Sequence, residues 1–217
     1  MRFSRTAHLE SNPVNPANPV NVHRLLLATR NSHKTREFVE ILGDGFDVHD
    51  LTDVAELPAV TETGRTFEAN AILKAVETSK HFQELVVADD SGLEVDALQG
   101  APGIHSARYA SERATDAANV AKLLTQLIRC DPAPHSARFR CSLALAQGGK
   151  ILKTFGAFIE GTIVSAPRGR AGFGYDSVFQ PLGFEQTFAE FSAAEKNRIS
   201  HRARAIRLLQ TALLAKS

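Results

Sequence analysis

A short apolar run followed directly by two aspartates constrains the fold more than any other part of the chain. Residues 85–88 read LVVA, a β-branched segment of the length of a buried strand. Asp89 and Asp90 come next, and a glycine-containing segment follows them. In open α/β sheets, ligands bind outside the carboxyl ends of the strands. An α/β fold would therefore place two carboxylates at its ligand-binding edge.

Asp89 and Asp90 are neighbours, so they are expected to have different roles. Successive strand residues point to opposite faces, which lets one carboxylate reach a metal ion or a water while the other braces the loop. The sequence Asp-Ser-Gly at residues 90–92 is also common in turns. On this segment alone, an Asx turn at a strand end is an equal alternative to a ligand site.

Charge and hydropathy argue against two classes of partner. The chain has 25 basic and 24 acidic side chains, whereas a dedicated nucleic-acid binder normally has a basic excess. No apolar run approaches the roughly 20 residues that cross a bilayer. We therefore expect neither a nucleic-acid nor a membrane partner. Cys130 and Cys141 lack the spacing of a metal site. A disulfide between them is an alternative, but two cysteines are explained more simply by a reducing, cytoplasmic setting.

Residues 1–21 differ in composition from everything that follows. Asn-Pro pairs recur there at a spacing of three residues, and large apolar side chains are almost absent. This pattern favours extended, unpacked chain. We predict a disordered N-terminal extension at 1–21, with a targeting segment as a weaker alternative, and one domain at 22–217.

The first strand, loop and helix of this domain have the layout of an anion site. Residues 23–28 are predicted to form a buried strand, and residues 29–34 a polar loop. The apolar spacing after this loop predicts a helix that ends at Gly43. Backbone N–H groups at such a helix start can face a negative ligand. Lys34 in the first turn opposes the helix dipole unless an anion lies nearby. A plain N-cap with a surface lysine is the alternative.

The middle of the chain supplies further candidate groups and the long strands. Thr66 is expected to cap a helix that carries Lys74, and Glu62 lies in the loop before it. An exposed lysine and a solvated glutamate are the alternatives. Thr115 is expected to cap an amphipathic helix that ends at residues 131–134. Residues 139–163 alternate across a Gly-Gly turn and predict an antiparallel hairpin.

The last third of the chain combines a glycine-rich aromatic loop with a cluster of cations. Phe173 or Tyr175 could stack a base, and Asp176 could accept hydrogen bonds from ring N–H groups. Ser192 to Glu195 has the capping-box pattern. The cations after it could form a solvated helix face, or the corner at residues 200–202 could hold phosphate. Aromatic anchors in a hairpin loop are the alternative for residues 167–176.

Together these parts favour one chemistry. Carboxylates suit Mg²⁺, cations neutralise a polyphosphate, and the aromatic loop can receive a base. The combination predicts metal-assisted attack of water on a nucleoside triphosphate.

Five segments in order resemble the inosine triphosphate pyrophosphatase family, which hydrolyses non-standard purine nucleoside triphosphates. The resemblance covers roughly residues 23–214. It rests on residues 27–34 (LATRNSHK), 88–93 (ADDSGL), 101–109 (APGIHSARY), 172–176 (GFGYD) and 195–202 (EKNRISHR).

The resemblance implies an α/β fold that is elongated and two-lobed, with a long central mixed β-sheet flanked by helices and the active cleft between the lobes. It implies a homodimer and a Mg²⁺-dependent reaction that converts ITP, dITP or XTP to the nucleoside monophosphate and pyrophosphate. Asp90 would be the proton acceptor and a metal ligand, with Glu62 as the other metal ligand. The substrate-binding residues would be Thr29, Arg30, Asn31, Ser32, His33, Lys34, Lys74, Ser91, Phe173, Gly174, Tyr175, Asp176, Lys196, His201 and Arg202.

Some positions depart from the family pattern. Arg30 and His33 stand where many members have glycine or small residues, and their bulk could narrow the phosphate site or add charge to it. Ala69 stands where a glutamate is common in the family. The family's acidic pair before Thr-Gly is reduced here to Thr61-Glu62, so only Glu62 is acidic. The second metal ligand therefore stays open between Glu62 and Asp89. The rivals are a septum-inhibitor type of nucleotide pyrophosphatase, a nucleotide-binding protein without turnover, and an RNA-binding module.

Overall fold

The computed structural model describes residues 22–54, 57–130 and 135–215. The predictions for residues 1–21 and 131–134 lie outside them. A six-stranded mixed sheet has the strand order β2-β1-β3-β4-β5-β6. β1 is parallel to β2 and β3, and the other pairings are antiparallel. The strands are β1 (His23–Leu27), β2 (Phe46–Asp50), β3 (Leu85–Val95), β4 (His135–Gln147), β5 (Lys150–Ile163) and β6 (Phe179–Pro181).

Helices cover both faces of this sheet. They are α1 (Ser32–Leu42), α2 (Phe67–Ser79), α3 (Asp116–Leu127), α4 (Ala193–Ile199) and α5 (His201–Leu214), with short 3₁₀ helices η1 (Asp96–Leu98), η2 (Gly103–Arg108) and η3 (Phe188–Glu190). The side chains of the predicted N-caps Thr66 and Thr115 accept hydrogen bonds from backbone N–H groups of their helices. Residues 192–195 form the predicted capping box. Among the described residues, no helix combines the length and apolar character needed to cross a membrane.

The strand that begins at residue 85 is longer than the sequence predicts. β3 continues through the two aspartates and pairs with β4 from Val86 to Val95, so the prediction of a strand end or Asx turn at residues 89–92 is wrong. The long antiparallel ladder outweighs the local turn preference of Asp-Ser-Gly. Gly92 is required for close approach, because a Cβ there would lie 2.4 Å from Ser106 Oγ. The aspartates therefore lie in the middle of the sheet.

The two faces of β3 pack against different helices. Val87 belongs to a core cluster that includes residues of α1 and α5, whereas Ala88 packs with the alanines of α2. Side chains alternate along a strand, so Asp89 faces the α1 and α5 side and Asp90 faces the α2 side. The backbone alternation of one strand thus separates the two carboxylates.

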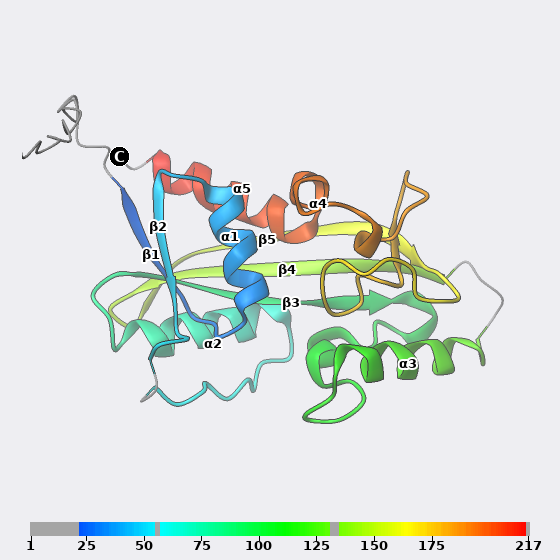
Figure 1. The fold of residues 1–217 in the computed structure, drawn as a ribbon. Coiled ribbons are helices and arrows are strands. Elements are labelled where there is room, and N and C mark those ends of the chain that lie inside the picture. Colours follow the sequence, from blue (N-terminus) through cyan, green and yellow to red (C-terminus); the bar gives the residue numbers. More distant parts are fainter. Residues whose placement is uncertain (1–21, 55–56, 131–134, 216–217) are drawn as a thin grey trace, which may run out of the picture.

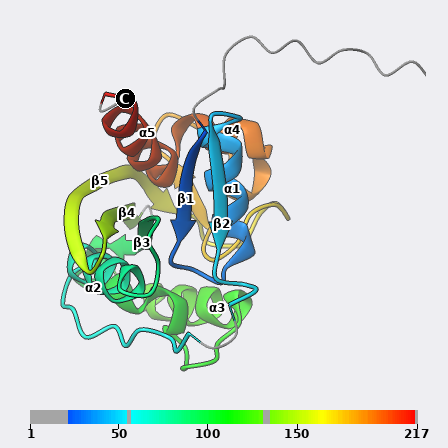
Figure 2. The same ribbon diagram turned by 90° about the vertical axis from the view of Figure 1, so that its left-hand side faces the viewer.

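The molecule is elongated and has two lobes that share the long strands (Figure 1). β1, β2 and α1 lie toward one end, and α3 lies at the other. Figure 2 shows α2 and α5 on opposite sides of the long strands. The predicted hairpin of long strands is confirmed as β4 and β5. A second core cluster packs α3 against the far part of the sheet, so the long strands pack against helices toward both ends.

Candidate active site

A pocket of about 340 Å³ lies over the middle of β3, a size typical of small-molecule sites. It draws its walls from both lobes. The predicted site residues that line it are Thr29, Asn31, Lys34, Glu62, Lys74, Asp90, Ser91, Phe173, Gly174, Tyr175, Asp176, Lys196, His201 and Arg202. Segments that are far apart in the sequence therefore meet at one cavity.

Three predicted site residues do not line this pocket. Arg30 donates to the backbone carbonyls of Val54 (3.0 Å) and Leu57 (2.6 Å), outside the cavity. Ser32 and His33 are exposed on the first turn of α1, where His33 stacks on Phe173. Neither Arg30 nor His33 therefore narrows the pocket.

Asp89 is the centre of a buried ion network on the α1 and α5 side. Its carboxylate accepts hydrogen bonds from Lys34 Nζ, Ser91 Oγ (2.9 Å) and Arg202 Nε (2.8 Å). Burial acts to raise the pKa of Asp89, but the charges of Arg202 and Lys34 outweigh it and hold this pKa well below the ordinary value. Asp89 is therefore an ionised brace that also supplies the anion that Lys34 needs at a helix N-terminus.

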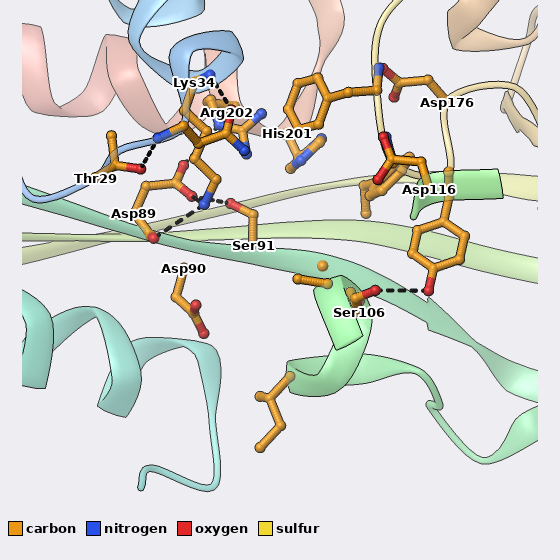
Figure 3. A pocket seen from close by; sticks show the side chains of 18 of the residues that line it. Thr29, Lys34, Asp89, Asp90, Ser91, Ser106, Asp116, Asp176, His201 and Arg202 are labelled. Atoms are coloured by element: carbon orange, nitrogen blue, oxygen red, sulfur yellow. Dashed lines mark hydrogen bonds and ion pairs between the residues drawn. The ribbon is translucent and has the colours of Figure 1, made fainter. Parts of the chain in front are cut away.

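Asp90 belongs to a separate cluster on the α2 side, and Figure 3 shows the two aspartates pointing in opposite directions. Lys74 Nζ lies 2.8 Å from Asp90 Oδ1 and 2.9 Å from Glu62 Oε1. Arg108 Nη1 lies 3.1 Å from Glu62 Oε2. Lys74 is largely buried, so it is not the exposed helix lysine of the alternative interpretation. Burial raises the pKa of Asp90, and Lys74 offsets this only in part.

At the pocket wall formed by residues 173–176, the buried ion network of Asp89 continues through Arg202. Lys196 Nζ lies 2.6 Å from Asp176 Oδ2 and 2.9 Å from Glu37 Oε1, and Arg202 Nη1 lies 2.6 Å from Glu37 Oε2. Lys196 and Arg202 are therefore not part of a solvated helix face. Burial raises the pKa of Asp176, and Lys196 offsets it in part. The Phe173 ring lies beside both cations, with Lys196 Nζ 4.8 Å from its centroid.

His201 is a buried, uncharged member of this wall. Its ring stacks on Phe139 with centroids 4.7 Å apart, and its Nδ1 has no hydrogen-bond partner among the described residues. Burial lowers the pKa of His201 well below its ordinary value, and the positive charges of Arg202 and Lys196 lower it further. A neutral imidazole is expected at this place across the physiological pH range.

Asp90 and Glu62 are the oxygen donors that suit a hard cation. Within the part of the chain that the structure describes, no group of three or more His, Cys, Asp or Glu side chains forms a ready metal site. Asp90 Oδ2 is nevertheless buried without a hydrogen-bond partner among these residues. The Asp89 carboxylate is occupied by Lys34, Ser91 and Arg202. Both oxygens of Glu62 are likewise paired, with Lys74 and Arg108. The donor that could take a divalent ion is therefore Asp90 Oδ2, and the second ligand stays open between Glu62 and Asp89.

Several groups in and around the pocket were not among the site residues predicted from the sequence. Arg108 and Ser106 come from η2, and Asp116 comes from the start of α3. Glu37 lies behind the wall and joins Lys196 to Arg202. Arg108 and Ser106 belong to the motif at residues 101–109, but their roles depend on contacts across the cleft. Glu37 follows Lys34 by three residues, which places both on one helix face. This spacing could have indicated Glu37 as a site residue.

Comparison with known proteins identifies the family of this architecture. Residues 25–212 match the model of the Ham1 family. The chain belongs to the Ham1 family. The resemblance to inosine triphosphate pyrophosphatases that the five motifs carry is thereby confirmed, and so is the predicted α/β fold.

Two dITP/XTP pyrophosphatases and one solved HAM1 structure resemble this chain over most of its length. The dITP/XTP pyrophosphatase of Bacillus licheniformis is 48% identical over 190 residues, which cover 87% of this chain and 97% of that protein. The dITP/XTP pyrophosphatase of Bacillus subtilis is 45% identical, covering 88% and 96%. A HAM1 protein from Coxiella burnetii superimposes with a TM-score of 0.81 at 39% identity, covering 90% of this chain and 100% of that one.

Proposed function

We propose that this Ham1-family chain is a nucleoside triphosphate pyrophosphatase that hydrolyses dITP, XTP and ITP to the nucleoside monophosphate and pyrophosphate. The observation that carries the proposal is the division of one pocket into two chemically distinct walls. Asp90, Glu62 and Lys74 form one wall, and Phe173 with Lys196 forms the other. A ligand with a phosphate chain at one end and a flat base at the other matches this division. The names of the relatives support the same substrate class.

The wall that Phe173 forms with Lys196, called the base wall below, favours a purine that carries a 6-keto oxygen. Lys196 and Arg202 are buried donors with no acceptor capacity, and both lie beside the Phe173 ring. A keto oxygen can accept a hydrogen bond from such a donor. A 6-amino group would leave buried donors facing a donor, a mismatch that costs about 1–3 kcal/mol.

Asp90 and Glu62 would hold the divalent metal ion, for which we propose Mg²⁺. When bound, such an ion polarises a phosphoryl oxygen and lowers the pKa of a bound water. The chain's own groups do the rest. Lys74 holds both carboxylates in place. Thr29, Asn31 and Lys34, the residues of the 29–34 loop that line the pocket, would contact the phosphates. Asp90 would orient the attacking water and accept its proton.

The nucleobase specificity is tested with a substrate panel. We expect purified enzyme with Mg²⁺ to hydrolyse dITP, XTP and ITP with kcat/KM about 10- to 100-fold above the values for dATP and ATP, because the adenine amino group meets buried donors. Pyrophosphate release gives the rates. Equal rates for 6-keto and 6-amino purines would contradict the assignment of the base wall. Tight binding of ITP without turnover would favour the nucleotide-binding protein, and a preference for modified standard nucleotides would favour the septum-inhibitor type.

The remaining parts of the proposal concern the assembly and the setting. Residues 22–217 are proposed to form the catalytic domain and to act as a homodimer in the cytoplasm. Exposed apolar side chains on β5, such as Leu152 and Phe158, are compatible with a partner subunit. Cys130 and Cys141 are free thiols, as a reducing compartment would leave them.

A further inference from the structure

His33 and Phe173 form an aromatic stack at the rim of the pocket. Their ring centroids lie 5.2 Å apart, and the planes are inclined by 19°. Phe173 is half-buried and lines the pocket, whereas His33 is exposed and does not line it. The stack therefore contacts Phe173 from outside the cavity and joins the first turn of α1 to the loop at residues 172–176.

The segment at residues 173–176 is held by a different element at each position. The Gly174 N–H donates to a carboxylate on α3 (2.6 Å), the Tyr175 hydroxyl donates to a carbonyl on η2 (2.9 Å), and Asp176 pairs with a lysine on α4 (2.6 Å). These partners are Asp116, Ser106 and Lys196. The contact from α1 is the His33 ring on Phe173. The stack completes a set of anchors that fixes the whole segment.

Of the two rings in this segment, Phe173 is the more exposed, and Lys196 Nζ and Arg202 Cζ lie 4.8 and 5.5 Å from its centroid. Tyr175 is 3% exposed and belongs to the core cluster around α3. The face of a nucleobase is recognised by stacking on an aromatic ring, and the strength of stacking depends on how well that ring is held. Rotation of Phe173 would remove the platform, so a contact that restricts this ring affects base binding without touching the base.

We propose that His33 is a positioning residue for the nucleobase: together with Lys196 and Arg202, which also lie over the Phe173 ring, it fixes this ring at the pocket wall so that a purine can pack against it. The inference rests on the proposed function, because it assumes that the ligand carries a base. It assigns His33 to the base end of the ligand, whereas the sequence resemblance placed it among the phosphate contacts.

The experiment compares His33→Ala, His33→Phe and the control His105→Ala, which removes an exposed histidine on η2 outside the pocket. Calorimetry gives the dissociation constant of IMP, and kinetics give KM and kcat for dITP. Inhibition by inorganic tripolyphosphate, which has no base, reports on the phosphate end alone. Thermal unfolding confirms that each variant is folded.

We expect His33→Ala to raise the IMP dissociation constant and the KM for dITP by roughly two- to tenfold, the worth of one aromatic pair. We expect kcat to stay within about twofold and the tripolyphosphate inhibition constant to stay unchanged. His33→Phe should restore base binding because it keeps a ring at this position. His105→Ala should match the wild type.

Three results would overturn the inference. An equal loss for tripolyphosphate would place His33 at the phosphates, and tighter IMP binding by His33→Ala would mean that the histidine competes with the base. Unchanged IMP binding would show that the stack is passive. Failure of the proposed function is distinguishable, since the wild type would then neither bind IMP nor hydrolyse dITP.

Discussion

Asp90→Asn is expected to lower kcat for dITP by about 10³-fold while leaving IMP binding within about threefold of the wild type. The reason is geometric. Asp90 Oδ1 is held by Lys74, and Asp90 Oδ2 is buried without a hydrogen-bond partner among the described residues, so a carboxylate oxygen remains for the reaction. Asparagine keeps the shape but loses the charge and the proton-accepting oxygen. The base wall is on the other side of the pocket and is untouched.

The matched control is Asp96→Asn, which removes an exposed carboxylate shortly after β3. Asp96 pairs with Arg138 outside the pocket, so this variant is expected to keep the wild-type kcat. Near-normal turnover by Asp90→Asn would remove Asp90 from the chemistry.

Arg202→Met is expected to lower the free energy of unfolding by about 3–5 kcal/mol at pH 7. The guanidinium is 3% exposed and pairs with Asp89 (2.8 Å) and Glu37 (2.6 Å), which are themselves buried. Methionine fills part of the space but leaves two carboxylates in the interior with less compensation. Urea denaturation measures the loss.

The control for this variant lies two residues further along the same helix. Arg204 is exposed and donates to one backbone carbonyl, that of Phe158, so Arg204→Met should cost about 1 kcal/mol or less. Equal losses for the two variants would contradict a special role of the buried network.

The pH dependence of the Arg202→Met loss gives an independent check. In the wild type, Arg202 lowers the pKa of Asp89 and of Glu37 against the effect of burial. Such carboxylates stabilise the fold above their unfolded pKa of about 4, and this contribution is lost as the pH falls through their folded pKa. Without Arg202 both pKa values rise, so the carboxylates can bind protons and the penalty should shrink between pH 7 and pH 5. A penalty that is constant with pH would argue against the loss of charge compensation as its cause.

Local rules predicted much of the fold. The caps at Thr66 and Thr115 and the capping box at residue 192 needed only the neighbouring residues, and the long hairpin followed from alternation across a glycine turn. The continuation of β3 did not follow, because the ladder with β4 is formed about 50 residues away in the sequence and overrides the turn preference of residues 89–92.

The site was predictable where a motif carried it and unpredictable where partners were distant. Lys196 looked like one of several helix cations, and its burial depends on Glu37, which lies on α1. Asp116 directly follows the predicted cap Thr115, yet its carboxylate accepts a hydrogen bond from the backbone N–H of Gly174 in the loop at residues 172–176. Such pairs are made by packing of the lobes, so spacing within one segment does not name the partner in the other.

The central claim is most directly tested by identifying the products of one reaction. Wild-type enzyme is incubated with dITP and Mg²⁺ and followed by phosphorus NMR. The proposed function predicts dIMP and pyrophosphate in equal amounts, and no reaction when a chelator removes the metal. Release of orthophosphate with dIDP, or binding of dITP without any product, would contradict it.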